Sequence, residues 1–356
     1  MRRNTVSRIM LLLLCLSLLP GCEPIRYYGQ AVGGQIDIWQ REQAIAELLA
    51  NPKIDQELRR KLLLIQSLRT FAFEQLALPH SDNYTTYANL DRPFVVWNVF
   101  ATPEFSFTPK VWCYPIAGCA SYRGYFSEKN ANAFADNLKQ AGWDVFVGGI
   151  AAYSTLGYFD DPVLSTFINR SDIRLAALIF HELSHQVVYV ADDTTFNESF
   201  AVAVEQAGLQ LWLKTTGNES DFQTYLTMQK RHKAFIEFIA SWREKLATIY
   251  QRSIEENEKR RLKRAAFATM QQDYNQFKQD WQNYNGYDRF MAATQSNAKL
   301  LTVTTYSDLV ADFSRILAQS GSFEIFYENV RKLAKLDYQA RREALTKPRR
   351  EALTSR

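Results

Sequence analysis

An apolar stretch between Leu175 and Val187 constrains the fold of this chain more than any other feature. In "DIRLAALIFHELSHQVVYV" the apolar residues recur at the three- and four-residue spacing of a helix, at Leu175, Leu178, Ile179, Leu183 and Val187. Ser171 suits the position before a helix, and Asp172 suits its first turn. The sequence therefore predicts one largely buried helix from Asp172 to about Val190.

Two of the four histidines in the chain lie on this predicted helix, one turn apart. At that spacing His181 and His185 project from the same face, so their ring nitrogens can bind one metal ion. Glu182 points to the side of the pair, where it can hold a water at the metal without being a ligand. An H-E-x-x-H pattern arises by chance in well under roughly one chain in a hundred of this length. The alternative is that the imidazoles only satisfy hydrogen bonds in the core, but burying them beside a carboxylate is unfavourable without partners.

A catalytic zinc site needs a third protein ligand and leaves a fourth position open for water. The next segment, "ADDTTFNESFAVAVEQ", predicts a turn over residues 192–196 and a second helix from about Asn197. Two antiparallel helices joined by a short turn bring the start of the second back towards the first. The candidate third ligands are the carboxylates Asp192, Asp193, Glu198 and Glu205. Glu198 lies in the first turn of the second helix, and Glu205 shares its face.

These motifs resemble the gluzincin arrangement, in which H-E-x-x-H is followed by a glutamate on the next helix. "NESFA", residues 197–201, is similar to the Asn-Glu-Gly-Phe-Ala segment of zinc aminopeptidases of the aminopeptidase N group. That resemblance implies that Glu198 is the third ligand. Because the separation from His185 is shorter here, Glu205 is the alternative, being nearer the thermolysin spacing. We favour Glu198 as ligand, with Glu205 steadying an imidazole.

Longer segments resemble the bacterial putative aminopeptidase family of predicted lipoproteins. They are "VVWNVFATPEFS" at residues 95–106, "WCYPIAGCASYRGYF" at 112–126 and "AAYSTLGYFDDPVLSTF" at 151–167, besides the H-E-x-x-H core. The resemblance implies a zinc-dependent peptidase with one Zn²⁺ per chain and a peptide substrate. The metal would lower the pKa of a water, and Glu182 would accept its proton and pass it to the leaving amine. We also considered a metallopeptidase-like envelope chaperone or assembly factor, and an inactive binding module, which would have no need of Glu182.

Gluzincins commonly use a further tyrosine or histidine to stabilise the transition state. The conceivable tyrosines are Tyr125, Tyr153, Tyr158, Tyr189 and Tyr306, of which Tyr153 and Tyr306 are the candidates by their places before and after the metal helix. His232 reads as a surface helix residue, and His80 is the fourth histidine.

The Gly-Ala-Met-Glu-Asn motif that binds the substrate ammonium in the aminopeptidase N group is absent. Glu104, Asp160 and Asp161 are possible replacements, so exopeptidase and endopeptidase remain alternatives.

The N-terminal segment predicts export. "MRRNTVSRIMLLLLCLSLLPGCEP" has three arginines before an apolar run, residues 9–19, that is too short to span a bilayer. "LLPGC" resembles a bacterial lipobox, which implies that residues 1–21 are removed and that Cys22 is lipidated. Ordinary signal-peptidase cleavage and an uncleaved anchor are the alternatives. By the same resemblance Glu23 favours sorting to the outer membrane, with the protein facing the periplasm.

In an exported chain, Cys113 and Cys119 suggest one local disulfide rather than two free thiols.

The order of predicted elements indicates an α+β fold with a zincin-like core. We expect helix over residues 35–73 with a break at Asn51 and Pro52, a strand after Pro93, a helix from Glu128 to Gln140, a strand from about Asp144 to Ala152, and long polar helices from about Asp221 to Trp281. The predicted segments are 23–90 (helical), 91–215 (catalytic core), 216–338 (helical) and 339–356 (a charged, disordered tail). The net charge of +4 gives no argument for nucleic-acid binding.

Overall fold

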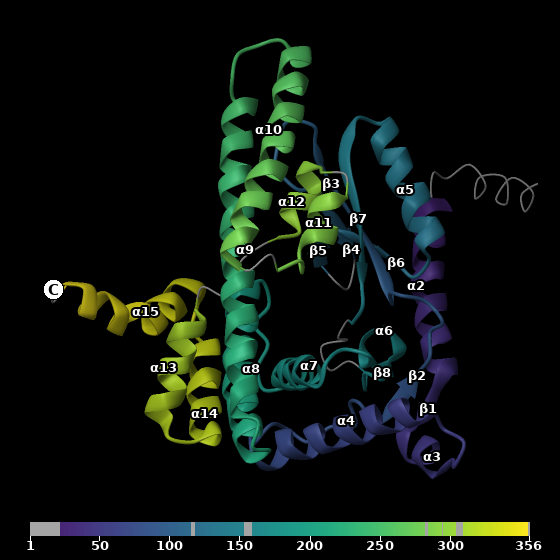
Figure 1. The fold of residues 1–356 in the computed structure, drawn as a ribbon, viewed down its shortest axis with the longest axis vertical. Helices are drawn as coiled ribbons and strands as arrows, with labels where there is room; N and C mark the ends of the chain where they lie inside the picture. The colour runs from purple at the N-terminus through teal and green to yellow at the C-terminus, as the bar shows by residue number, and fades with distance from the viewer. Residues whose placement is uncertain are drawn as a thin grey trace, which may run out of the picture.

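The computed structural model describes residues 22–114, 118–152, 159–281, 284–293, 295–303 and 309–354 (Figure 1). Within these ranges no helix combines the length and the apolar character needed to cross a membrane. The predicted signal peptide, residues 1–21, lies outside them. Its removal and the lipidation of Cys22 therefore stay predictions.

The N-terminal part is helical, as expected, but a short strand interrupts it. The elements are α2 (Cys22–Arg41), β1 (Glu42–Ala44), α3 (Ile45–Ala50) and α4 (Gln56–Glu74). The predicted break at Asn51 is confirmed, since α3 ends there. The carboxylate of Asp55 accepts a hydrogen bond from the backbone N–H of Leu58 at 2.9 Å and so starts α4. A continuous helix from Gln35 to the break was wrong, because β1 pairs with a second strand, β2 (Thr86–Ala88), instead.

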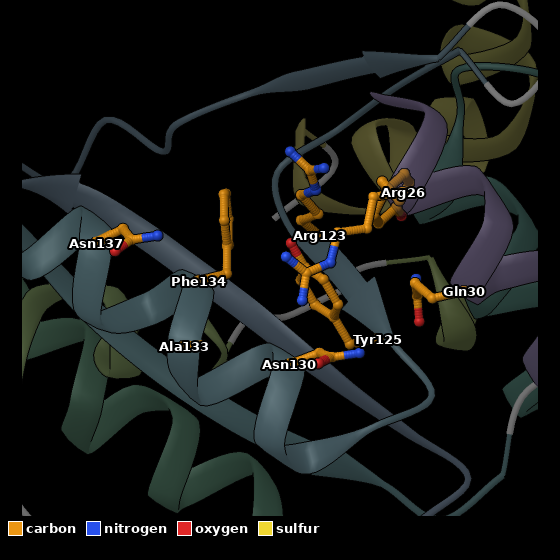
Figure 2. A pocket seen from close by; sticks show the side chains of 9 residues that line it. Arg26, Gln30, Arg123, Tyr125, Asn130, Ala133, Phe134 and Asn137 are labelled. Atoms are coloured by element: carbon orange, nitrogen blue, oxygen red, sulfur yellow. The ribbon is translucent and has the colours of Figure 1, made fainter. Parts of the chain in front are cut away.

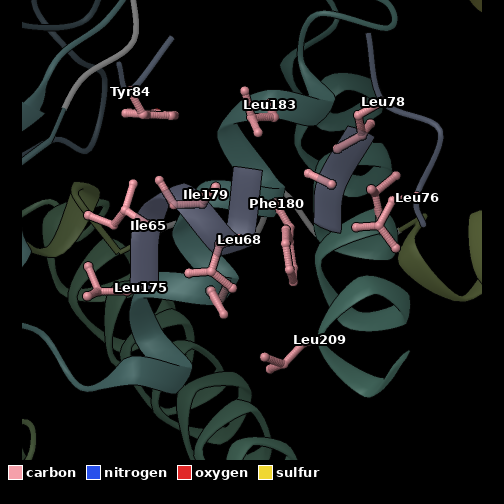
Figure 3. Packing of buried hydrophobic residues seen from close by; sticks show 14 of the residues in the cluster. Ile65, Leu68, Leu76, Leu78, Tyr84, Leu175, Ile179, Phe180, Leu183 and Leu209 are labelled. Atoms are coloured by element: carbon pink, nitrogen blue, oxygen red, sulfur yellow. The ribbon is translucent and has the colours of Figure 1, made fainter. Parts of the chain in front are cut away.

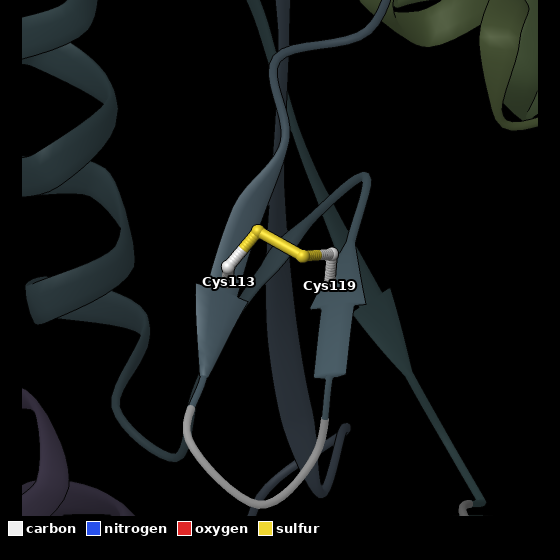
Figure 4. Close-up of a disulfide and its surroundings, with 2 residues drawn as sticks. All are labelled: Cys113 and Cys119. Carbon is white, nitrogen blue, oxygen red and sulfur yellow. A yellow bond between two sulfur atoms is a disulfide. The ribbon is translucent and has the colours of Figure 1, made fainter.

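Three small sheets follow. One has the order β1-β2-β8, with β8 at Val163–Leu164; the second has the order β6-β3-β7, and all its pairs are antiparallel. Its strands are β6 (Arg123–Tyr125), β3 (Val96–Pro103) and β7 (Trp143–Ile150), and α5 (Glu128–Gln140) packs on them. The predicted bounds of α5 are confirmed. In the third sheet β4 (Trp112–Tyr114) pairs with β5 (Gly118–Ala120), and a disulfide joins Cys113 to Cys119 (Figure 4).

The two helices of the H-E-x-x-H segment come next in the chain. After α6 (Ser165–Ile168) follow α7 (Asp172–Ser184) and α8 (Thr194–Thr215). The expected extension of α7 to Val190 was wrong, because the chain leaves the helix in tight turns, in which Gln186 N–H donates to the carbonyl of Leu183 at 3.2 Å. β-branched residues after His185 add to this, since their restricted side chains disfavour helix. The second helix begins three residues before the expected Asn197.

The C-terminal part is almost wholly helical. Its elements are α9 (Glu219–Tyr250), α10 (Glu256–Phe277), the 3₁₀ turn η1 (Lys278–Trp281), α11 (Asp288–Ala292), α12 (Asn297–Leu301), α13 (Val310–Ser320), α14 (Phe323–Ala334) and α15 (Tyr338–Thr354). α9 and α10 form a long hairpin (Figure 1). The expected disordered tail was wrong: α15 is a helix, with Leu345 fully buried and Arg341 only 4% exposed. The repeated charged residues of this segment favoured a disordered tail, and the burial of Leu345 could not be seen from them.

One large apolar core holds the site in place. It draws on α4, α7, α8, α9 and α13 to α15, and Leu68, Leu175, Phe180 and Leu209 are among its fully buried members (Figure 3). α7 lies against α4 through its buried residues and against α8 along its length. The α+β class predicted from the sequence is confirmed, and this shared core spans several of the predicted segments.

Candidate metal centre and active site

The last turn of α7 presents the two histidines on its polar side. Ile179, Phe180 and Leu183 are buried in the core (Figure 3), which leaves His181 and His185 to project away from it. His181 lies within the helix, and His185 is the residue that ends it. The two rings lie 5.0 Å apart, nearly perpendicular to each other. The helical spacing thus produces the paired imidazoles that the sequence predicted.

The turn between the two helices is held by a side chain. The amide of Asn197 donates to the carbonyl of Val190 at 2.8 Å and accepts from its N–H at 2.9 Å. Asp193 starts α8 by accepting from the N–H of Phe196 at 3.1 Å. Asp193 is buried and paired with Arg341 at 2.9 Å, which removes it from the set of candidate metal ligands. The turn brings the first turn of α8 back to the histidines.

Glu198 bridges the two imidazoles. Its carboxylate oxygens lie 3.3 Å from Nε2 of His181 and 3.8 Å from Nε2 of His185. One donor atom from each of the three residues lies within 4.8 Å of the others. Two imidazole nitrogens and a carboxylate oxygen are a donor set that zinc binds. The geometry therefore suits the preferred set of His181, His185 and Glu198.

Glu205 meets the other ring nitrogen of His181. Its Oε2 lies 3.0 Å from Nδ1 of His181, and its Oε1 accepts a hydrogen bond from the Tyr225 hydroxyl at 2.7 Å. Gln229 donates to that hydroxyl at 2.8 Å. Glu205 thus occupies the position of a carboxylate that orients an imidazole rather than that of a third ligand. By contrast, Nδ1 of His185 is buried with no partner in the described part of the chain.

The charges around His181 favour a cation at this place. Burial alone lowers the pKa of His181, but its hydrogen bonds with Glu198 and Glu205 outweigh burial and raise that pKa to about 10. Burial and the charge of His181 lower the pKa of His185 to about 4. Burial raises the pKa of Glu198, yet the bond with His181 brings the net shift below the ordinary value. Two carboxylates at one imidazole therefore favour positive charge at this place.

Glu182 lies at a cleft beside the histidines. The cleft has a volume of about 600 Å³ and is lined from α7, α8, α9 and the segment before α11 by residues that include His181, Glu182, Glu205, Tyr225, His232 and Tyr287. Burial raises the pKa of Glu182, and the negative charges of Glu198, Asp161 and Glu205 add to this against the charge of His181. A carboxylate with a raised pKa beside open space is suited to proton transfer near neutral pH.

The sequence did not predict that three residues of α9 would lie at the cleft. Tyr225, Gln229 and His232 follow one another at four and three residues on α9, so they share a face. These polar residues on one face of α9 were the feature of the sequence that could have indicated a cleft. His232 is exposed, as predicted for a surface helix, but its Nδ1 lies 3.2 Å from the hydroxyl of Tyr287 at the cleft. Tyr287 stacks on Phe235 with ring centroids 4.0 Å apart, which fixes its place.

Among the other candidate residues, Tyr153, Tyr158 and Tyr306 lie outside the described residues, so their places stay predictions. Tyr189 is exposed, and Tyr125 belongs to the three-stranded sheet, where it lines a separate pocket of about 260 Å³ between α2, β6 and α5 (Figure 2). His80 packs against the ring of Phe73.

The acidic residues proposed to bind a substrate ammonium are also dispersed. Glu104 pairs with Arg260 at 2.9 Å. Asp160 is exposed. Asp161 is buried and near enough to Glu182 for its charge to raise the pKa of Glu182. Of these three acidic residues, Asp161 is therefore the one whose charge acts on the candidate site.

Fold and site together define an α+β protein whose H-E-x-x-H helix and following helix gather two histidines and a glutamate beside a cleft. The chain matches the family described as Putative aminopeptidase over residues 26–345, and it belongs to that family. The family's description indicates a peptidase with a peptide substrate. Comparisons with curated proteins and with solved structures return no match.

Proposed function

We propose that this protein is a zinc-dependent peptidase, with His181, His185 and Glu198 as the metal ligands and Glu182 as the general base. The observation that carries the proposal is the approach of the Glu198 carboxylate to Nε2 of both histidines, 3.3 and 3.8 Å away. Glu182, the residue after His181, lines the adjoining cleft. The core around this site is proposed to be zincin-like on the same grounds.

The residues present fit a zinc ion. They offer two imidazole nitrogens and one carboxylate oxygen, which are donor types that zinc takes in catalytic sites. The two carboxylates that raise the pKa of His181 to about 10 supply negative charge beside the three donors. When bound, zinc supplies a Lewis acid and lowers the pKa of a coordinated water.

The chain's own residues supply the proton transfers. The carboxylate of Glu182 accepts a proton from the attacking water and delivers it to the nitrogen of the leaving amine. The raised pKa of Glu182 brings it closer to the pKa values of the water and the leaving amine between which Glu182 transfers the proton. Glu205, held by Tyr225, keeps the ring of His181 in one orientation and tautomer by binding Nδ1.

The test combines metal content with hydrolysis. We expect the purified protein to contain about one zinc per chain. Glu182→Gln should retain the zinc and lose at least roughly a hundredfold in kcat/KM, because only the base is removed. Glu198→Ala should lose both zinc and activity. Glu237→Gln, an exposed position on α9, is the matched control and should change neither.

A peptide mixture with mapped new termini gives the reaction type. Loss of single N-terminal residues identifies an aminopeptidase, as the family's description indicates, and internal cuts identify an endopeptidase. Hydrolysis that is unchanged in Glu182→Gln contradicts the mechanism. Bound zinc without hydrolysis of any peptide would favour a chaperone or assembly role instead.

The proposal includes a location at the bacterial envelope. It rests on the N-terminal sequence, in which an apolar run and a lipobox-like "LLPGC" precede α2. Fractionation of cells should recover the protein with the membranes. Recovery in the soluble fraction argues against a lipid anchor at Cys22.

A further inference from the structure

One end of the cleft is basic. Arg170 precedes α7, Arg174 lies in its first turn, and both line the cleft together with Glu182. Arg174, Leu178 and Glu182 are four residues apart, so they form one row along the helix that leads to the proposed base. The row places Arg174 on the same wall as Glu182, and Arg170 lines the cleft just before the helix begins.

The described residues leave an excess of positive charge on this wall. Within the described ranges neither Arg170 nor Arg174 forms an ion pair, and the contact of Arg174 is a weak one, from Nη2 to Sδ of Met228 at 3.8 Å. Of the described residues that line the cleft, the carboxylates are Glu182 and Glu205. Glu205 is already bound by His181 and Tyr225. The opposite wall, from α9, contributes a tyrosine, a methionine, a glutamine and a histidine.

Two further observations place the charges close together. Burial lowers the pKa of Arg170, and the charge of Arg174 lowers it further, while the charge of Glu182 raises it. The charges of Arg174 and Arg231 act on the phenol of Tyr287 across the cleft. A second arginine beside a half-buried one is unfavourable unless an anion lies between them. Glu182 is the one negative group that these shifts place beside Arg170, so the two arginines leave positive charge at this end of the cleft that a negative group of a substrate can meet.

The dimensions suit a short peptide. Arg174 lies eight residues before Glu182, a rise of about 12 Å along the helix. An extended peptide advances about 3.3 to 3.6 Å per residue, so this span corresponds to about three or four residues. The cleft volume of about 600 Å³ is in the range of small-ligand sites.

We propose that Arg170 and Arg174 form a carboxylate-binding subsite, which selects peptides carrying a negative group within a few residues of the bond that is cut. The guanidinium groups match a carboxylate by charge and by paired N–H donors. The carboxylate comes from the C-terminus of a short peptide or from an aspartate or glutamate side chain. This inference rests on the proposed peptidase function and adds the substrate class to it.

The experiment compares matched peptides. Tetraalanine as the free acid and as its carboxamide tests the C-terminal carboxylate. The carboxamides of Ala-Ala-Asp-Ala and Ala-Ala-Asn-Ala test the side chain. We expect the acidic member of at least one pair to have a kcat/KM roughly tenfold or more above its neutral partner, mainly through a lower KM.

Variants assign the preference to the arginines. In Arg170→Gln, Arg174→Gln and the double variant the ratio of acidic to neutral kcat/KM should fall towards one. Arg170→Lys should keep part of the preference because it keeps the charge. Arg252→Gln, exposed at the α9–α10 connection, removes the same charge elsewhere and should keep the full ratio. Equal kcat/KM within both pairs, or a full preference in the double variant, overturns the proposal.

A binding measurement separates this proposal from the peptidase function. The same peptides are titrated calorimetrically into Glu182→Gln, in which hydrolysis is not expected. Tighter binding of the acidic member, lost when the two arginines are also replaced, supports the subsite even if no peptide is cut by the wild type. Equal binding of acidic and neutral peptides refutes the subsite, whereas absence of hydrolysis with intact selective binding refutes the peptidase alone.

Discussion

Individual side chains around His181 form a chain of hydrogen bonds that ends on α9. Gln229 donates to Tyr225, Tyr225 donates to Glu205, and Glu205 meets Nδ1 of His181. His185 has no such support at its Nδ1 in the described residues. The orientation of the His181 ring is thus fixed by hydrogen bonds, whereas that of His185 is not fixed in this way. The geometry of the proposed metal site therefore depends most on the hydrogen bonds from Gln229 through Tyr225 and Glu205 to His181.

Tyr225→Phe should weaken zinc binding without removing a ligand. The change deletes the hydroxyl that fixes Glu205, so the ring of His181 is less well oriented, and the dissociation constant for zinc should rise roughly tenfold. Competition with a chromophoric chelator measures it. Tyr250→Phe, which removes a comparable bond to Asn297 in the α9–α10 cluster, is the control. An equal loss in both variants would mean that the effect is structural rather than local.

At the scale of elements, α4 supports α7 from its start to its end. Their apolar faces pack together in the core, and Asp172 in the first turn of α7 binds Arg60 and Lys61 of α4, each at 2.8 Å. Lys61 is almost buried and also donates to the carbonyl of Arg170 at 2.6 Å. This contact holds the beginning of the helix that carries both the histidines and the proposed arginine subsite.

Asp172→Asn should lower the free energy of unfolding at pH 7 by about 1 kcal/mol, because it removes a negative charge at the helix start and the ion pairs with Arg60 and Lys61. The effect is no larger because Asp172 and Arg60 are partly exposed. The hydrogen bonds from Arg60 and Lys61 lower the pKa of Asp172 below 3.8 despite burial. A lowered pKa contributes stability that is present above about pH 4 and is lost as the pH falls through the folded-state value.

Urea unfolding at pH 7 and pH 3 measures this effect. The difference between wild type and variant should be smaller at pH 3. Asp136→Asn, which breaks an exposed pair with Lys139, should have almost no effect at either pH. A difference that grows on acidification would contradict the assigned sign.

At the scale of the whole molecule, the C-terminal helix belongs to the same core as the site. α15 inserts Leu345 into the large core and pairs Arg341 with Asp193, the residue that starts α8. The side chains of this pair are 5% and 2% exposed. Glu198 follows in the next turn of α8, so the last helix of the chain supports the placement of a proposed metal ligand.

Arg341→Ala should cost about 3 kcal/mol of stability, because it leaves the buried carboxylate of Asp193 with only its weaker neighbour. Arg342 lies 3.7 Å from the same carboxylate but is more exposed, so Arg342→Ala is a close control and should cost less than about 1 kcal/mol. Urea denaturation of both variants tests the prediction. Similar values for the two arginines would show that the buried pair is not what anchors α15.

Much of the fold could be predicted from local patterns. The bounds of α5, the break after α3 and the start of α7 follow from apolar spacing and from residue types that favour helix ends, which act within a few residues, although the Ser171 side chain makes no capping hydrogen bond. The end of α7 could not be predicted, because the turn after His185 is held by Asn197, twelve residues later. α15 was missed for the same reason, since its buried partner Asp193 is distant in the chain.

By itself the sequence determined the paired imidazoles and the position of Glu182, because the pitch of a helix sets which side chains share a face. Only the tertiary structure decided how Glu198 and Glu205 divide between the two nitrogens of His181. That division depends on the angle at which α8 returns to α7. The cleft depends on contacts still further apart, because α9 must fold over α7 before Tyr225, His232 and Arg174 can face one space.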